Sequence, residues 1–571
     1  MNFTNPLLSF IETYWIYLFI FAVYWQLIII LKKKGILERF NITSHGPLLM
    51  IRTTRGQDFL NWIAKIKSFW RLFADIGIIL MIIGMLIMFI MVIIFDISTM
   101  ISLHKETLPP PTELNKLKNL FLIPGINDFI PFVWGLIALI VTLVVHEFSH
   151  AILCRVEDIR VKSMGLILVL IPIGAFAEPD EDQLFEKQEN AIEKIENELK
   201  QEKEPQQPIA NRRQRVRILS AGVMANFVTA FIAFILFFIV IGSIAPVSNV
   251  LITEIEPGSP ADIAGITNLT LIIKINDEPI ENVSAFFDCM NSLTPGETVR
   301  MQIKKDSTIQ EVVLQSDPEL KDTISGVRFD EVISDTPAKS AGLIDGMIIT
   351  RIDNTTISDM QAFFNFMTNT TPDQKMVIYA LFANEDFNYT IILNENPTDE
   401  EKGFIGITGF SNVAICRPLG MYVGEYHAKE LLSFLQMIPS LMTGIYGWII
   451  LLVLPFPNPF IGSFQGFSST IIMFYEPIGL AAYFGKGVFW VANSLLWIMW
   501  MNFYVGLFNC LPMLPLDGGH VLRDSVHSIL ERLFGDGKRM GEIAGKVATG
   551  FAIIMLASLV LMVIAPSLSQ I

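Results

Sequence analysis

The chain has 571 residues, of which 52% are hydrophobic and only 17% are charged. This length exceeds that of one ordinary domain, and so little charge is typical of a membrane protein rather than a soluble one. The formal net charge of −15 argues against nucleic acid as a partner, because phosphate contacts need a basic surface.

Six apolar stretches are each long enough, at about 20 residues, to cross the hydrocarbon core of a membrane as a helix. They lie at 13–31, 74–95, 132–153, 218–242, 488–508 and 547–566. A weaker apolar region at 431–484 is interrupted by five prolines. That region favours either an interfacial or re-entrant segment, with no crossing, or a broken pair of crossings.

The basic residues predict how these helices are oriented. Segment 32–72 carries nine lysines and arginines, so the positive-inside bias places it in the cytoplasm and the N-terminus outside. By the same rule, helix 132–153 runs from outside to inside and segment 518–546 is cytoplasmic. The charged segment 177–217 is then a solvated cytoplasmic linker or helical hairpin.

Residues 246–408 are soluble in character and contain an internal repeat. The sequence SPADIAGI at 259–266 matches TPAKSAGL at 336–343, and a second pair of similar segments follows in the same register. Two domains of one fold in tandem explain this pattern. The repeated pattern resembles PDZ domains of the bacterial type, and we expect these domains outside the cell.

The sequence His146-Glu147-Phe148-Ser149-His150 is an HExxH motif within an otherwise almost fully apolar helix. Residues four apart share one helix face, so both imidazoles can bind one metal ion, and neutral imidazole suits zinc. Glu147 lies near the same site and can take a proton from water. Structural pairing of these groups is the alternative, but three ionisable groups in hydrocarbon cost several kcal/mol, which favours a functional role.

A catalytic zinc ion needs a third protein ligand and an open position. The candidate is Asp517, within FNCLPMLPLDGGH at 508–520, just beyond the cytoplasmic end of a predicted helix. The orientation places Asp517 at a depth similar to that of His146. The prolines and glycines around it predict a broken helix, which is tolerated at that depth where it is buried or lines a watery cavity. The alternative is an ordinary interfacial loop with an N-cap aspartate.

These motifs together resemble the site-2 protease family: HEFSH in one membrane helix, N-x-x-P-x-x-P-L-D-G-G in a later one, and tandem PDZ-like domains between them. The segment 163–181 is similar to the family's re-entrant β-loop, and 215–230 is similar to the helix that follows it. The resemblance covers most of 132–566. It leaves the two N-terminal crossings outside the three-helix core of the family.

The resemblance implies roles for individual residues. The zinc ligands are His146, His150 and Asp517, and the general base and acid is Glu147. The substrate-binding residues are Asn509 and, in the β-loop, Gly174, Ala175 and Phe176. A helix interior offers no free backbone groups, so the substrate must unwind before it is cut, and the edge of the β-loop can pair with the unwound strand.

The expected fold is a polytopic α-helical membrane protein with a three-helix metalloprotease core and two extracytoplasmic PDZ-like α+β domains. We expect an N-terminal transmembrane region, a first core part, the two PDZ-like domains, an interfacial or re-entrant region, and a second core part with a C-terminal transmembrane helix. Their ranges are 1–130, 131–245, 246–322, 323–408, 409–486 and 487–571.

The function that the resemblance implies is zinc-dependent endopeptidase activity on transmembrane helices, as in regulated intramembrane proteolysis in the cell membrane. The partners implied are membrane lipid and a single-pass protein that has already been trimmed outside. Neither repeat has a clear carboxylate-binding loop, so a steric filter is as good an interpretation of the PDZ-like pair as peptide binding.

A membrane transporter that binds metal, or an inactive scaffold, is the rival class of protein. A transporter should carry further intramembrane carboxylates or histidines along a path, and the chain has few, of which Asp75 and Glu476 are the nearest. An inactive scaffold should have lost the glutamate or a ligand, and this chain keeps them all.

Overall fold

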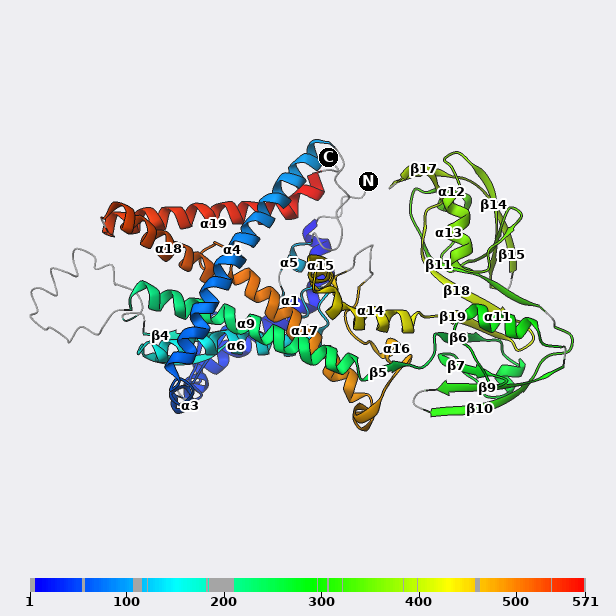
Figure 1. Ribbon diagram of the computed structural model, residues 1–571, viewed down its shortest axis with the longest axis horizontal. Helices are drawn as coiled ribbons and strands as arrows, with labels where there is room; N and C mark the ends of the chain where they lie inside the picture. The colour runs from blue at the N-terminus through cyan, green and yellow to red at the C-terminus, as the bar shows by residue number, and fades with distance from the viewer. Residues whose placement is uncertain are drawn as a thin grey trace, which may run out of the picture. The chain divides into compact units, whose positions relative to one another are not determined.

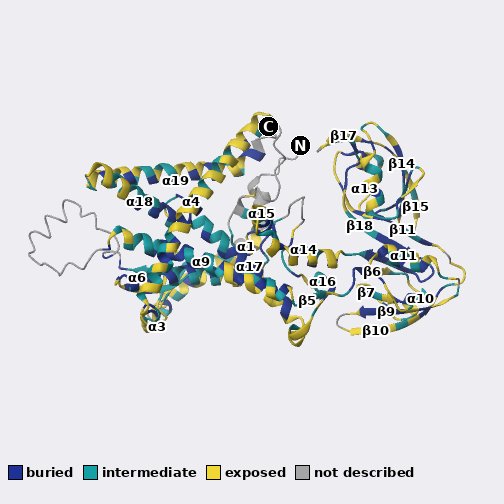
Figure 2. Cartoon of the chain, in the orientation of Figure 1, coloured by how far each residue is buried: buried dark blue, intermediate teal, exposed yellow. Residues whose placement is uncertain are grey.

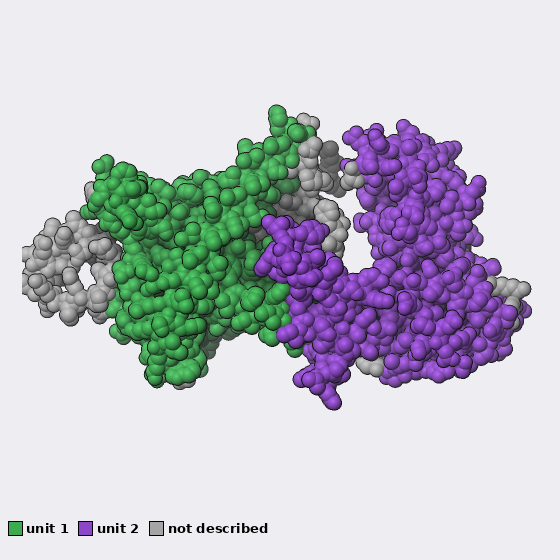
Figure 3. Space-filling view, in the orientation of Figure 1, with its two compact units in different colours: residues 1–237, 452–466, 491–571 green, residues 238–451, 467–490 purple. Residues whose placement is uncertain are grey.

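The computed structural model of the chain is shown in Figure 1. Its described residues are 6–53, 57–105, 116–120, 122–180, 183, 210–294, 296–305, 308–320, 322–383, 385–397, 399–456, 463–535 and 537–568. The expected linker at 177–217 lies mostly outside these residues. The described chain forms two compact units, coloured separately in Figure 3, with residues 1–237, 452–466 and 491–571 in the first and 238–451 and 467–490 in the second.

Five described helices are long and apolar enough to cross a membrane. They are α4 (Lys67–His104), α6 (Phe132–Val156), α9 (Arg212–Ile241), α17 (Gly487–Asn509) and α19 (Gly537–Leu568). In the most apolar 18-residue segment of each helix, only 11% of the residues of α4 are buried, against 50% of those of α17. α17 therefore packs among other helices, whereas most of α4 is coloured as exposed or intermediate (Figure 2). The first expected crossing falls in α1 (Pro6–Lys33), part of which lies outside the described side chains.

Shorter helices connect these long ones. In the first unit they are α2 (Ile36–Arg39), α3 (Gln57–Ile63), α5 (Leu117–Leu120) and α18 (Asp517–Phe534). In or next to the second unit they are α14 (Ala428–Leu441), α15 (Ile445–Val453), α16 (Ser469–Ile472) and the 3-10 helix η2 (Gly479–Phe484). The described part of region 431–484 is therefore built from short helices and one short strand, β20 (Tyr475–Pro477), which pairs with β5 (Ile244–Pro246).

A four-stranded antiparallel sheet in the first unit joins the N-terminal region to the segment after the HExxH motif. Its order is β1 (Ile42–His45), β2 (Leu48–Thr53), β3 (Val161–Val169) and β4 (Ile171–Pro179). At Gly165 a Cβ would lie 1.9 Å from the Ile51 carbonyl oxygen, so the close approach of β2 to β3 requires glycine. β1 and β4 are the two edge strands of this sheet.

Ion pairs fix the charged ends of α4, α6 and α9 against one another. Arg217 on α9 pairs with Asp75 on α4 at 2.7 Å and with Glu157, just after α6, at 3.2 Å. Arg71 also pairs with Glu157, at 3.1 Å, and the Glu157 side chain is only 2% exposed. A carboxylate this deeply buried needs such partners, so these contacts fix the relative positions of the three helices.

The second unit contains two lobes that share one sheet. The strand order is β10-β9-β7-β6-β19-β18-β11-β12-β14-β15. The strands are β6 (Val250–Ile255), β7 (Thr270–Ile275), β9 (Thr298–Lys305), β10 (Thr308–Gln315), β11 (Thr323–Val332), β12 (Ile348–Ile352), β14 (Lys375–Phe382), β15 (Glu385–Ile392), β18 (Ile407–Cys416) and β19 (Met421–Glu425). The two-residue strands β8 (Glu278–Pro279) and β13 (Thr355–Thr356) flank it, and β16 (Asn394–Asn396) pairs with β17 (Asp399–Phe404).

The sequence repeat appears as matching elements in the two lobes. The first lobe has α10 (Pro260–Ile263) and α11 (Val283–Asn291), and the second has α12 (Pro337–Ala341) and α13 (Met360–Thr368). α10 and α12 both begin with proline, which suits the first position of a helix because its missing N–H has no intrahelical partner there. Each lobe has its own core, centred on Phe286 in the first and Phe363 in the second.

The second lobe is inserted into the sequence of the first lobe, whose last strand follows it. The expected domain boundary at residue 408 does not include this last strand. The end of β18 and β19 return to the first lobe, where β19 pairs with β6. Five residues of these strands and of the turn between them belong to the core of the first lobe: Ala414, Cys416, Leu419, Met421 and Val423. The first lobe therefore closes only after the second is complete, and residues 409–425 do not belong to the expected interfacial region.

This nesting makes a prediction about fragments of the second unit. We expect a fragment of residues 246–426 to unfold in urea with one cooperative transition for each lobe. Circular dichroism monitors the unfolding. A fragment that stops at residue 408 loses the five core residues and should leave the first lobe unfolded, because each large buried side chain is worth about 2–5 kcal/mol. Equal folding of both fragments would contradict the nested arrangement.

Candidate metal centre

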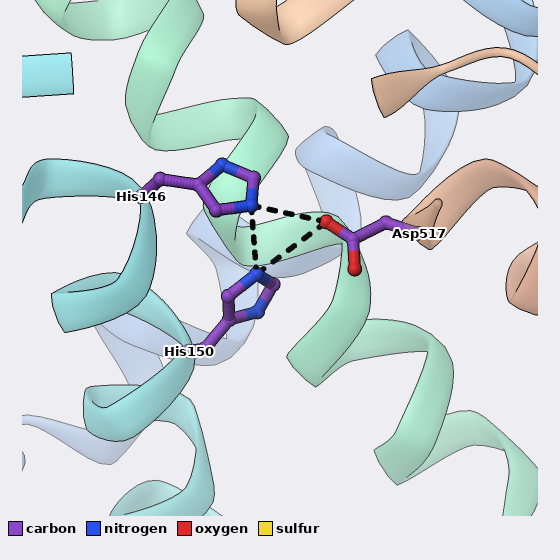
Figure 4. Close-up of side chains that lie close together, drawn as sticks. All are labelled: His146, His150 and Asp517. Carbon is purple, nitrogen blue, oxygen red and sulfur yellow. Dashed lines mark hydrogen bonds and ion pairs between the residues drawn. The ribbon is translucent and has the colours of Figure 1, made fainter. Parts of the chain in front are cut away.

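Three side chains from distant parts of the chain converge in the first unit, as Figure 4 shows. His146 and His150 lie one turn apart on α6, and Asp517 is the first residue of α18. The His146 Nε2 atom lies 3.2 Å from Asp517 Oδ2 and 3.1 Å from His150 Nε2, and His150 Nε2 lies 3.4 Å from the same carboxylate oxygen. One atom of each residue therefore points at a common centre.

The distances between these atoms fit a zinc ion. Zn²⁺ binds imidazole nitrogen and carboxylate oxygen at about 2.0–2.2 Å in a tetrahedron, whose ligand atoms are then about 3.3 Å apart. The three observed separations of 3.1, 3.2 and 3.4 Å match that spacing. Three protein ligands leave a fourth tetrahedral position open, which is the arrangement of a catalytic rather than a structural site.

Backbone and amide groups on α9 orient the two imidazoles. His150 Nδ1 lies 2.7 Å from the Ile218 carbonyl oxygen, so Nδ1–H donates there and Nε2 keeps its lone pair for a metal. His146 Nδ1 lies 3.2 Å from the amide nitrogen of Asn226, whose Oδ1 is buried without a hydrogen-bond partner. A half-turn of the Asn226 amide lets Oδ1 accept from His146 Nδ1–H and gives this buried oxygen its partner.

Gly222 on α9 provides the room for both histidines. A Cβ at this position would lie 2.5 Å from His150 Nε2 and 2.7 Å from His146 Cε1. Both distances are too short for real side-chain contacts, so any larger residue at 222 displaces the imidazoles.

Tight turns deliver Asp517 to the site. The chain leaves α17 at Asn509 and folds back before α18 begins at Asp517. A Cβ on Gly518 would lie 2.4 Å from the Leu511 carbonyl oxygen, and one on Gly519 would lie 2.5 Å from the Leu514 nitrogen. The two glycines of the LDGG sequence therefore allow this close return of the backbone, which is the broken helix that the sequence predicts.

The charge of Asp517 suits a metal ligand. Without a metal, burial raises the pKa of its carboxyl group, but the positive charge of the imidazoles of His150 and His146 when protonated, together with their hydrogen bonds, outweighs burial and holds the pKa below its usual range. Asp517 is therefore ionised, and its carboxylate is ready to bind a cation.

Glu147 lies beside β4, one of the two edge strands of the small sheet. Its Oε2 atom accepts a hydrogen bond of 2.9 Å from the Ala177 N–H on β4. That N–H therefore points away from β3, along the open edge of β4. Glu147, which the sequence predicts to be the general base, thus projects from the ligand helix α6 to the edge of β4.

The four residues expected to bind substrate occupy two places. Gly174, Ala175 and Phe176 lie on β4, opposite Ile167, Leu166 and Gly165 of β3. Asn509 is the last residue of α17, and its Nδ2 donates to the Val505 carbonyl oxygen at 3.0 Å. β4 therefore contacts Glu147 through the hydrogen bond from the Ala177 N–H. The Asn509 amide, in contrast, makes its hydrogen bond within its own helix.

Reasoning from the residues did not identify Asn226, Gly222 or Ala177. Asn226 offered one signal, because a fully buried amide in an apolar helix is costly unless it has a partner. Gly222 and Ala177 offered none, since their roles depend on the rotation of α9 and on the strand edge that faces α6.

Comparison with known proteins places these features in a family. The profile of "Peptidase family M50" matches residues 134–557. Protease RseP of Yersinia pestis is 23% identical over 475 residues, covering 74% of this chain and 97% of that protein. The regulator of sigma-E protease RseP of Escherichia coli is 23% identical over 70% of this chain and 91% of its own length. An uncharacterized protein of Methanocaldococcus jannaschii is 27% identical over 48% of this chain and 65% of its own length.

The space at Gly222 can be tested directly. Gly222→Ala should weaken zinc binding roughly 10–100-fold, the usual cost of disturbing groups that orient metal ligands. Zinc retained against a competing chelator, measured by mass spectrometry, reports the change. Gly545→Ala on α19 is the matched control, because a Cβ there meets nothing within 4 Å. Equal zinc retention in the two variants would show that Gly222 does not shape the site.

A buried ion pair should fix α18, and with it Asp517. Arg215 on α9 donates to Asp524 at 2.9 Å, and their side chains are 14% and 5% exposed. Asp524→Asn leaves a buried guanidinium without its partner and should lower stability by about 3–5 kcal/mol, seen as a lower melting temperature in detergent. Asp158→Asn, which breaks an exposed pair with Lys67, should change little. Equal melting temperatures for the two variants would show that the Arg215–Asp524 ion pair does not hold α18 in place.

Proposed function

The chain belongs to peptidase family M50, and on that premise we propose that it is a zinc-dependent intramembrane endopeptidase that cuts transmembrane helices. One observation carries the proposal: two imidazoles and a carboxylate from membrane-associated helices converge with the spacing of a tetrahedral zinc site, and a glutamate follows the first ligand. Five apolar helices and the membrane-protein relatives support a multi-pass protein as the setting.

His146, His150 and Asp517 would hold the ion. Zn²⁺ bound there would supply a Lewis acid that polarises the scissile carbonyl and makes water acidic enough to lose a proton near neutral pH. Glu147 is the group placed to take that proton and to pass it to the leaving amine. Its hydrogen bond from the Ala177 N–H fixes one carboxylate oxygen and leaves the other to accept the proton.

The edge of β4 explains how an unwound substrate could be held. Along a strand, alternate N–H groups point to the same edge, so the N–H of Ala175 lies on the same open edge as that of Ala177. A substrate segment that leaves its helix exposes backbone groups that need partners in an apolar surrounding. Pairing with β4 satisfies these groups and places the segment beside Glu147.

The substrate class that we propose is a single-pass membrane protein already trimmed outside the cell. The nested lobes of the second unit would lie outside, where they filter what reaches the membrane helices, and lipid surrounds α4 and α19. The basic segment 32–72 supports this orientation, because the positive-inside bias favours the cytoplasmic side for strands β1 and β2 and for the ion pairs around Glu157.

The test compares the wild type with Glu147→Gln on a single-pass model substrate in liposomes. Glutamine keeps the size of the side chain and its bond to the Ala177 N–H but cannot take a proton, so cleavage should fall by about 100-fold or more. Zinc content should be unchanged, because Glu147 is not a ligand. Glu311→Gln, on an exposed position of β10, is the control for the same chemical change.

Zinc content and cleavage together decide the outcome. Loss of cleavage with full zinc content in Glu147→Gln supports both the chemistry and the role of the residue. A wild-type protein that takes up no zinc would contradict the metal site, and undiminished cleavage by Glu147→Gln would contradict the assignment of the base.

A further inference from the structure

A cavity of about 280 Å³ lies in the second unit, at the junction of the two lobes. The starts of α11 and α13 form two of its walls, and β18 and the end of β19 with the residues just after it form the others. Its lining residues are Asn282, Ser284, Asp359, Met360, Gln361, Phe364, Asn412, Glu425 and His427. This volume is just below the range of about 300–1,000 Å³ that is usual for small-molecule sites, and the cavity is open to solvent, so a side chain of a partner can enter it.

Glu425 is a buried carboxylate in the wall of this cavity. Its side chain is only 6% exposed. Its Oε2 atom accepts a hydrogen bond of 2.9 Å from the neutral amide of Asn412, while its Oε1 atom lies 3.6 Å from Nδ1 of the half-exposed His427. A carboxylate is rarely buried to this degree without a strong cationic partner, and neither contact supplies one.

The rest of the wall also favours a cation. Asp359 adds a second carboxylate, and among the described residues that line the cavity none is lysine or arginine. The ring of Phe364, which is 45% exposed, provides a flat face on which a planar cation can stack. Carboxylates and an aromatic face together match the guanidinium group, whose planar fork of N–H donors pairs with carboxylates and stacks on rings.

We propose that this cavity binds the arginine side chain of a polypeptide partner. The guanidinium pairs with Glu425 and Asp359, and the Phe364 ring stacks on it. Because the walls come from both lobes, the bound side chain also ties the second lobe to the first. The site lies wholly in the second unit and does not depend on the proposed peptidase chemistry.

The structure of the wall allows conservative variants. Glu425→Gln keeps an acceptor for the Asn412 amide, and that amide's oxygen still accepts from the Met360 N–H. Asp359→Asn keeps the N-cap of α13, because asparagine caps a helix as well as aspartate does. Both variants therefore remove a negative charge from the cavity while keeping the hydrogen bonds from the Asn412 amide and from the Ala362 N–H at the N-cap.

The experiment measures binding of dansyl-Gly-Gly-Arg-Gly-amide to the full-length protein in detergent by fluorescence. Both peptide ends are blocked, so arginine carries its one positive charge. Saturable binding is expected, with Kd raised at least tenfold by Glu425→Gln and several-fold by Asp359→Asn. Asp386→Asn, which removes an exposed carboxylate from β15 outside the cavity, should change Kd less than twofold.

A second peptide makes the test independent of the folding of any variant. Citrulline replaces arginine with nearly the same shape but no charge, and on the wild-type protein it should bind at least tenfold more weakly. Equal binding of the arginine and citrulline peptides, or an unchanged Kd in Glu425→Gln, would overturn the proposal.

Discussion

The first unit is organised by the need to place two histidines, a glutamate and an aspartate among apolar helices. Such groups are tolerated there only when each finds a partner. The imidazoles of His146 and His150 point one nitrogen at the shared centre and the other at a group on α9, and the Glu147 carboxylate accepts from β4. Gly222 and the tight turns before α18 serve the same purpose. They let α6, α9 and α18 approach closely enough for His146, His150 and Asp517 to meet at one point.

Polar contacts at one end of these helices support the site from a distance. The Arg215–Asp524 pair joins α9, which orients both histidines, to α18, which carries Asp517. Arg217 joins the same α9 to α4 and to the end of α6. The N-terminal region, which the family resemblance leaves outside the core, therefore takes part in fixing it, through α4 and through the pairing of β2 with β3.

Spacing and residue type were enough to predict much of the molecule. The HExxH spacing, the broken helix at Asp517 and the repeat are local signals, and the family match confirms the resemblance that they carry. Contacts set by the packing of distant segments could not be predicted in this way. The Asn226–His146 contact depends on how α9 is rotated, and the strand that closes the first lobe lies beyond a whole inserted lobe. The cavity at Glu425 depends on both lobes together, so neither repeat contains it alone.

The most direct measurement of the central claim is X-ray absorption at the zinc edge on the purified protein. The account predicts one zinc ion per chain with only nitrogen and oxygen ligands at about 2.0–2.2 Å, including two imidazoles, and loss of this signal in Asp517→Ala. Sulfur ligands at about 2.3 Å, or a zinc signal that Asp517→Ala leaves unchanged, would contradict it.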